Sequence, residues 1–384
     1  MSLALPFAAL PAATPDEYRL DAFGIVMLLE DNYAYPERLA GGRYALTPKL
    51  ETERDAVHDD ASLLAFAERA LLLLEDHHAI TGSSFPDSWG IVPSFADLWI
   101  ERQDGTYRIT AVRENSPAEK AGIKAGSKVT AINKVETAQA VAAFWADLGR
   151  VAPIDDRAAS FAARILAAGR RDRFRALTIH QSGHAPHDFP LPSLYTLPFP
   201  KDPVSAVMKD GALTIRINDS LGMDATITAF DLAMTGLAAG TPVLIDISNT
   251  PSGGTSSVAR AIMGWFVTQP RFYQIHNSPG EERRTGIARQ WIEQVLPRSG
   301  GKYHAAPVSV RVSRWTGSMG EGIAIGMHAL GYPVSGGPMG QLLGAIEDFR
   351  LPHSGQIIKF PTEKLFGVDG TPREAFVAPL EAQR

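Results

Sequence analysis

The amino-acid sequence predicts an α/β protein in which a helical region and a small module of strands and turns precede a larger core. Apolar residues recur at helical spacing before residue 78, and strand-and-turn patterns replace them from about residue 89. From residue 204 onward, strands alternate with helices, the pattern of a sheet covered by helices. We therefore expect a helical region (1–88), a small β-rich module (89–154), a connecting region (155–203) and an α/β core (204–384).

Composition and charge exclude several classes of protein. The 384 residues carry a net charge of −5, whereas general nucleic-acid binders show a basic excess. The absence of cysteine excludes disulfides, thiolate metal sites and a cysteine nucleophile. No apolar run approaches the roughly 20 residues that span a bilayer. We expect neither a nucleic-acid partner nor a membrane span.

The start of the chain leaves the cellular location open. Residues 1–13 are apolar and end in Leu-Pro-Ala-Ala, but they lack the basic start of an intact signal peptide. One interpretation is the remnant of an export signal, which implies a periplasmic or otherwise exported protein. The other is an apolar arm on a cytoplasmic protein.

The helical region contains one strongly patterned helix. Asp59 or Asp60 is a plausible N-cap, and the pattern stops at the polar run 75–78. The residues that form a single apolar face are Leu63, Phe66, Ala67, Ala70, Leu71 and Leu74.

The module over 89–154 resembles a PDZ domain. The resemblance rests on the segment 112–133, in which Ser116 and Pro117 start a short helix and Gly122 and Gly126 follow at turns. Such a PDZ-like domain captures peptide C-termini by strand addition and holds the carboxylate in a nest of backbone N–H groups. We expect that nest at Gly90 and Ile91, and a protein or peptide partner, possibly bound through its C-terminus.

Three histidines lie close together in the connecting region, at His180, His184 and His187. Such a group suggests either a metal site or a polar turn between two short strands. We favour the turn, because Asp188 is the only carboxylate beside them. The sequence implies no metal and no organic cofactor.

The core alternates strands and helices in a regular order. The expected strands lie at 213–217, 243–247 and 308–312, and the second is the continuous apolar run of a buried central strand. The expected helices lie at 225–237, 255–266 and 321–330, the last closed by Gly331.

Ser318 is the first candidate for chemistry. It follows a strand and precedes a helix, whose N-terminal N–H groups favour a developing oxyanion. Gly317 and Gly320 leave its hydroxyl uncovered. A second segment, 246–254, runs from a buried strand through a Gly-Gly turn that can aim N–H groups at an anion. Each segment taken alone is also typical of an ordinary strand-to-helix turn.

The order of these segments resembles the C-terminal processing (tail-specific) peptidase family, which includes the tricorn core protease. The resemblance implies a crotonase-like ββα-spiral catalytic core with an inserted PDZ-like domain. It also implies a serine peptidase that forms an acyl-enzyme on Ser318, with an oxyanion hole from Met319 and from Gly253 or Gly254. The family usually has an arginine in the glycine turn where this chain has Ser248.

The same resemblance suggests which base activates the serine. Gln341 occupies the position at which many members of the family have a catalytic lysine, so a Ser–Lys dyad is not expected. The tricorn-like branch uses a histidine and a C-terminal carboxylate, which match His78 and Glu374. His77 is an adjacent rival for the base. The expected triad is Ser318, His78 and Glu374.

Two other classes of protein share parts of this pattern. A dinucleotide-binding enzyme is disfavoured because the segment 316–322 misses the G-x-G-x-x-G spacing. A catalytically inactive protein that binds peptide or lipid on the same fold stays an alternative. The sequence leaves substrate identity and oligomeric state open.

Overall fold

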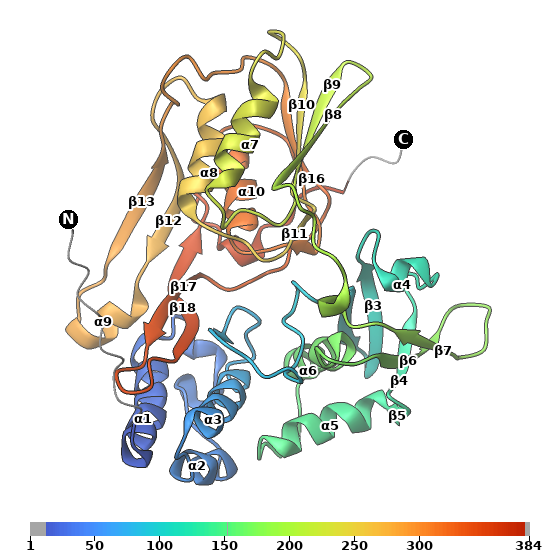
Figure 1. Cartoon of the computed structure of the whole chain (residues 1–384), viewed down its shortest axis with the longest axis vertical. Coiled ribbons are helices and arrows are strands. Elements are labelled where there is room, and N and C mark those ends of the chain that lie inside the picture. The colour runs from blue at the N-terminus through green and yellow to red at the C-terminus, as the bar shows by residue number, and fades with distance from the viewer. Residues whose placement is uncertain (1–12, 152, 381–384) are drawn as a thin grey trace, which may run out of the picture.

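The computed structural model describes residues 13–151 and 153–380, arranged as three packed regions (Figure 1). Residues 1–12, on which the expectation of an export signal rests, lie outside the described residues. Within the described ranges, no helix is both long enough and apolar enough to cross a membrane.

The N-terminal helices are α1 (Pro15–Asn32), α2 (Pro48–Asp55) and α3 (Asp60–Leu72). The N-cap of α3 is Asp59, whose carboxylate accepts the N–H of Ser62 at 2.8 Å. The apolar face predicted for this helix is buried, from Leu63 to Leu71. Its core also contains side chains from the C-terminal part of the chain, among them Leu343, which precedes β17, and Phe360 of β18. The first and last parts of the chain therefore fold as one unit.

The α/β core is built on two sheets with helices between them (Figure 1). The first sheet has the order β16-β14-β10-β9-β8, and its first four strands run parallel. Its strands are β8 (Val204–Lys209), β9 (Ala212–Ile217), β10 (Val243–Asp246), β14 (Val308–Arg311) and β16 (Val334–Ser335). The helices are α7 (Ala225–Met234), α8 (Ser256–Met263) and α10 (Met319–Ala329). These elements confirm the strand and helix order predicted for the core.

The second sheet joins the core to the N-terminal region. Its order is β1-β18-β12-β13, with β17 also paired to β18. Its strands are β1 (Ile80–Thr81), β12 (Arg271–Asn277), β13 (Gln290–Val295), β17 (Ala345–Arg350) and β18 (Ile357–Phe366); α9 (Pro279–Thr285) links β12 to β13. Because β1 follows α3 directly and pairs with β18, the residues between α3 and β1 are brought against the core.

The PDZ-like region is a third sheet, with the order β2-β3-β4-β6-β7 and β5 paired to β4. Its strands are β2 (Leu98–Gln103), β3 (Thr106–Val112), β4 (Lys128–Ile132), β5 (Val135–Glu136), β6 (Arg175–His180) and β7 (His187–Leu191). Its helices are α4 (Pro117–Lys120), α5 (Thr137–Asp147) and α6 (Asp156–Ala168).

This sheet corrects one expected boundary. β6, β7 and α6 come from 155–203, which was expected to be a connecting region, and their buried side chains share a core with β2 and β3. The boundary at residue 154 therefore divides one structural unit. The error has a physical cause, because the pattern of α6 indicates a helix with one apolar face but does not say against which sheet that face packs.

The three clustered histidines belong to this unit. His180 ends β6 and His187 begins β7, so the expected polar turn between two short strands is confirmed. Within residues 13–151 and 153–380, no group of three metal-ligating side chains is clustered.

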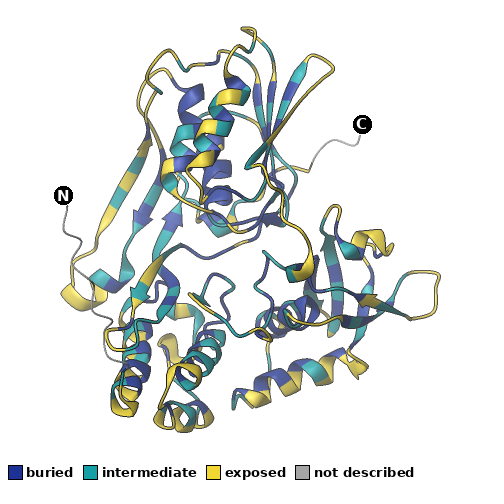
Figure 2. Ribbon diagram, viewed as in Figure 1, coloured by how far each residue is buried: buried dark blue, intermediate teal, exposed yellow. Residues whose placement is uncertain are grey.

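Burial follows the same division into regions. Figure 2 shows α10 as an almost wholly buried helix at the centre of the core, and its residues Met319 to Met327 are all buried. A helix enclosed on all sides holds its first residue firmly. That first turn carries the candidate nucleophile.

Candidate active site

Ser318 stands between β15 (Trp315–Thr316) and the first residue of α10. β15 pairs in parallel with β11 (Asn249–Thr250), with Thr316 opposite Thr250. Two parallel strands in register end at the same edge, so Ser318 and the glycine turn after β11 come together. The backbone of Ser318 has φ 51° and ψ −115°, a conformation that L-residues rarely adopt and that is associated with functional sites.

The structure brings His78 to Ser318 across 240 residues of sequence. The imidazole Nε2 lies 3.0 Å from Ser318 Oγ. The other ring nitrogen, Nδ1, lies 2.6 Å from the carbonyl oxygen of Leu343. A carbonyl oxygen accepts only, so Nδ1 carries the proton and Nε2 is left to accept from the serine hydroxyl. This is the arrangement that a general base needs.

The environment of His78 keeps the ring neutral. Burial lowers the pKa of His78 to about 4, and the positive charge of Arg373 acts in the same direction. The ring is therefore an uncharged proton acceptor at neutral pH. Its rival His77 stacks on Phe161 of α6 at 4.5 Å between ring centres, and burial lowers its pKa well below the usual value. Only His78 contacts the serine.

Glu374 does not reach the imidazole, which corrects the expected triad. The carbonyl of Leu343 occupies the position beside Nδ1, and Glu374 Oε2 is buried without a hydrogen-bond partner. The Glu374 carboxylate lies instead beside Tyr35 and Asp76, and it acts with burial to raise the pKa of both groups.

Arg373 is the residue of the C-terminal segment that points into the site. Its Nη2 donates to the carbonyls of Leu342 at 3.0 Å and Gly344 at 2.7 Å. These two carbonyls flank Leu343, whose own carbonyl orients His78. Arg373 therefore fixes the backbone that takes the place of the expected carboxylate.

Two buried carboxylates hold the loops on either side of Ser318 and His78. Glu321 accepts the N–H groups of Ser318 at 2.9 Å, Gln341 at 2.8 Å and Leu342 at 3.2 Å. Burial raises the pKa of Glu321 to about 7, although Arg373 at 3.9 Å opposes that shift. The backbone N–H of Gln341, the residue at the expected lysine position, is therefore committed to a structural bond.

The second carboxylate is Asp76. Its Oδ1 accepts the backbone N–H of His78 at 2.9 Å, and its Oδ2 accepts the hydroxyl of Tyr33 at 3.0 Å. Burial raises the pKa of Asp76 to about 6. Asp76 thus ties the base loop to the residue that ends α1.

The glycine turn lies against the serine, as expected for an oxyanion hole. A Cβ added to Gly253 would lie 2.3 Å from Ser318 Cβ and 2.8 Å from its Oγ. A Cβ added to Gly254 would instead meet the backbone of Leu221 at 2.0 Å, so Gly253 is the glycine of this turn that packs on the serine. Within the part of the chain that the structure describes, the N–H groups of Met319, Gly253 and Gly254 donate to no acceptor. All three N–H groups are therefore free to serve an oxyanion, and Gly253 and Met319 are the two whose residues contact or adjoin Ser318.

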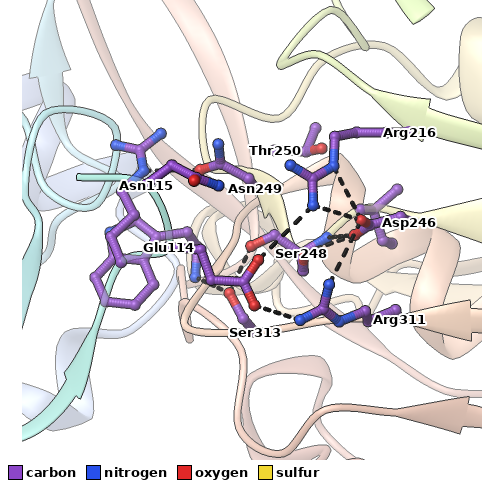
Figure 3. A network of polar contacts seen from close by, with 12 residues as sticks. Glu114, Asn115, Arg216, Asp246, Ser248, Asn249, Thr250, Arg311 and Ser313 are labelled. Carbon is purple, nitrogen blue, oxygen red and sulfur yellow. Dashed lines mark hydrogen bonds and ion pairs between the residues drawn. The ribbon is translucent and has the colours of Figure 1, made fainter. Parts of the chain in front are cut away.

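Polar contacts fix the rest of this turn (Figure 3). Ser248 donates its N–H and hydroxyl to Asp246 Oδ1, at 3.0 and 2.6 Å. Asp246 also pairs with Arg216 at 2.7 Å and Arg311 at 3.7 Å. Glu114 of the PDZ-like region pairs with the same two arginines. The chain lacks the usual arginine in the turn itself, but two arginines from the neighbouring strands surround Asp246.

The PDZ-like region also contacts the turn directly. Arg113 Nε donates to Asn249 Oδ1 at 2.7 Å, and the hydroxyls of Ser252 and Ser94 lie 3.1 Å apart. On the other side of the turn, Ser252 donates to Asp219 through both its N–H and its hydroxyl. The small sheet therefore braces the turn beside the nucleophile.

The expected carboxylate nest at Gly90 and Ile91 is not available. The N–H of Gly90 donates to the carbonyl of Gly169 at 2.8 Å, and that of Ile91 to the hydroxyl of Tyr195 at 3.4 Å. Strand addition needs the free edge of β2, and α6 covers it. Arg164 of α6 donates to the carbonyl of Ile100 at 3.0 Å.

A second bond from α6 completes that cover. The N–H of Arg102 donates to Ser160 Oγ at 2.8 Å. Ile100 and Arg102 are alternate residues of β2, the spacing at which an edge strand presents its backbone groups outward. The helix therefore uses the groups that a peptide strand would need.

Comparison with known proteins agrees with this architecture. Residues 108–144 match the sequence model of a PDZ domain. A photosystem II D1 C-terminal processing protease superposes with a TM-score of 0.55 at 13% identity, over 96% of this chain and 93% of that one. The chain has the fold of a C-terminal processing peptidase. Mature CPAF complexed with lactacystin gives 0.55 at 10% identity, over 93% and 91%. No curated protein matches the sequence.

The sequence did not reveal four of the residues that build this site. Glu321 and Asp76 lie inside the serine and histidine segments without a motif of their own, although a glutamate three residues after an N-cap is a known capping signal. Arg373 adjoins Glu374, the residue that the family resemblance favours. Leu343 acts through its backbone, which no side-chain motif reports.

Proposed function

We propose that the chain is a serine peptidase that hydrolyses peptide bonds in proteins or peptides through an acyl-enzyme on Ser318. The observation that carries the proposal is the contact of Ser318 Oγ with His78 Nε2 at 3.0 Å, on a ring whose Nδ1 is bound by the carbonyl of Leu343. The fold shared with processing peptidases supports the same activity.

In the proposed mechanism, Ser318 Oγ attacks the carbonyl carbon of the substrate while His78 Nε2 takes the hydroxyl proton. The oxyanion that forms receives hydrogen bonds from the N–H groups of Met319 and Gly253. The protonated ring then gives its proton to the leaving amine, and the acyl group stays on Ser318. Water, deprotonated by the same ring, releases the acid and restores the serine.

The proposed catalytic unit is a pair, Ser318 and His78, in which the base His78 is oriented by the carbonyl of Leu343. A carbonyl fixes the tautomer of the ring as a carboxylate would, but it stabilises the charged ring less, because it carries only a dipole. Burial already disfavours the charged form. We therefore expect a slower enzyme than one with a full triad, unless substrate binding moves Glu374 toward the ring.

The parallel sheet, the helices packed on it and the second sheet support a crotonase-like ββα-spiral as the catalytic core. The cover of α6 on β2 argues against capture of a peptide C-terminus by the PDZ-like region. We propose instead that substrate specificity lies around Ser318 and the glycine turn. Periplasmic or other exported location stays a prediction.

Labelling by a serine-reactive fluorophosphonate tests the proposal. Ser318 should be modified, as read by intact mass, and the Ser318→Ala variant should not be. The matched control is Ser83→Ala, which removes an exposed hydroxyl and should label like the parent protein. Cleavage of an unstructured protein substrate, lost in Ser318→Ala and His78→Ala, then distinguishes a peptidase from another serine hydrolase. Folded protein that neither labels nor cleaves would favour a binding protein on the same fold.

A further inference from the structure

A polar cavity lies behind the base, at the junction of the three regions. Its volume is about 440 Å³, within the usual range for small-molecule sites. One wall comes from α6 and β2, and a second from residues 75–77, just before the base, together with Arg38. The third wall comes from Gly340, Gln341, Leu343 and Glu374. Ser318 does not line it, so the cavity does not open onto the nucleophile.

The walls of this cavity carry unused hydrogen-bonding groups. Nine buried side-chain atoms in the described residues lack a hydrogen-bond partner, and five of them belong to residues that line the cavity. These five are Arg38 Nε, Glu75 Oε2, His77 Nε2, Arg157 Nη1 and Glu374 Oε2. Buried polar groups are nearly always satisfied, so such a concentration indicates a polar occupant.

The unused groups have opposite charge on different walls. Arg157 donates through Nη2 to the carbonyl of Arg38 at 2.7 Å and forms an ion pair with Glu75 Oε2 at 3.0 Å, so its charge is partnered and its Nη1 is the nitrogen left without a bond. Arg38 has no carboxylate within ion-pair distance among the described residues. Glu374 likewise has no cation within that distance, and it lies beside the buried carboxylate of Asp76. The cavity therefore presents unpaired donors on Arg38 and on Nη1 of Arg157, and an unpaired acceptor on Glu374.

We propose that this cavity binds a small zwitterion that carries an amine and a carboxylate, such as a free amino acid or a dipeptide. The carboxylate accepts from Arg38 and Arg157, since guanidinium groups bind carboxylates in charge-assisted hydrogen bonds. The amine donates to Glu374. A lone anion leaves Glu374 unsatisfied and a lone cation leaves Arg38 unsatisfied, so a ligand with both charges fits the site best.

The location places such a ligand in contact with the two segments that hold the base His78. The cavity is lined by His77, which precedes the base, and by Leu343, whose carbonyl orients it. It is also lined by Gln341, whose backbone N–H is bound by Glu321. A bound zwitterion touches both segments that hold His78. The inference concerns binding and stands whether or not Ser318 is a nucleophile.

Thermal unfolding of the Ser318→Ala protein in the presence of alanine or alanyl-alanine tests the proposal, because a ligand that binds only the folded state raises the melting temperature. We expect a saturable rise with at least one of the two compounds, which also tells whether the site takes an amino acid or a dipeptide. N-acetylation and C-terminal amidation should each weaken binding by about tenfold or more, since each removes one charge.

Variants locate the binding. Arg38→Gln and Glu374→Gln should each abolish the rise, whereas Arg271→Gln and Glu347→Gln, which neutralise exposed residues away from the cavity, should preserve it. No rise with either compound up to about 10 mM, a Kd range in which binding is already very weak, would overturn the proposal. It would equally fail if acetate or methylammonium alone matched the zwitterion, or if both cavity variants kept the full response.

Discussion

The two halves of the candidate site are held in place differently. Ser318 is fixed from within the core, by the buried helix α10, by Glu321 and by the glycine turn that pairs through β11 and β15. His78 belongs to the N-terminal region and is held by Asp76 and by the carbonyl of Leu343. The nucleophile depends on steric fit within one module, whereas the base depends on packing between two. Substitutions on the two sides should therefore lower activity for different physical reasons.

The largest effect is expected on the nucleophile side, at Gly253. Gly253→Ala places a methyl group 2.3 Å from Ser318 Cβ, on a backbone with φ +69°. We expect activity and fluorophosphonate labelling to fall by about 10³-fold or more, because both the serine and an oxyanion donor move. Gly183→Ala is the control, since Gly183 has φ +80° but an added Cβ meets nothing within 4 Å. Equal losses in the two variants would show that backbone strain alone is responsible.

A smaller effect is expected on the base side, at Arg373. Arg373→Met removes the donors to the Leu342 and Gly344 carbonyls, so the Leu343 carbonyl loses its support. We expect kcat to fall by about 10²-fold, the usual cost of disturbing a general base. The pKa of His78 should rise from about 4 toward its ordinary value, because the charge of Arg373 helps to lower it.

The titration of His78 separates this effect from simple destabilisation. Ring protons followed by NMR, assigned with a His78→Gln variant, report the protonation of this side chain directly. Asp76 and Glu321 titrate nearby, with pKa values of about 6 and 7, so a pH–rate profile alone is ambiguous. A His78 pKa that does not move in Arg373→Met would contradict the assigned contact.

The smallest effect is expected at Glu374. In a full triad, loss of the carboxylate costs roughly 10⁴-fold in kcat. Here Glu374→Gln should cost less than about tenfold, because the Leu343 carbonyl already fixes the ring. A loss near the triad value would mean that Glu374 moves onto His78 when substrate binds. The measurement is kcat at saturating substrate. The control is the Asp348→Asn variant, which neutralises an exposed carboxylate on β17.

The sequence predicted the fold class and the serine–histidine contact, because both depend on the types and spacing of side chains along the chain. The apolar face of α3, the strand–helix alternation of the core and the order of the two glycine-flanked segments are such patterns. Glu374 was predicted wrongly as the partner of the ring, since spacing along the chain does not say which of two adjacent side chains approaches the segment that holds His78. Arg373 binds that segment, whereas the buried Glu374 carboxylate lies beside Tyr35 and Asp76.

Backbone contacts lay beyond prediction for a related reason. The carbonyl of Leu343 and the covered edge of β2 belong to groups that every residue possesses, so no residue type marks them. The cover on β2 comes from α6, whose alanines permit close approach to the strand while Ser160 and Arg164 supply the bonds. Only the packed chain identifies which backbone groups remain free.

The helix α6 has a consequence for inhibitor design. In most PDZ-bearing proteins, a short peptide mimic enters beside the edge strand and displaces the natural ligand. In this protein such a mimic would have to compete with a helix of the same chain, which is present at a high effective concentration and loses no translational freedom on binding. Compounds that react with Ser318 or that enter the polar cavity face no such competitor, so those two sites are the practical targets.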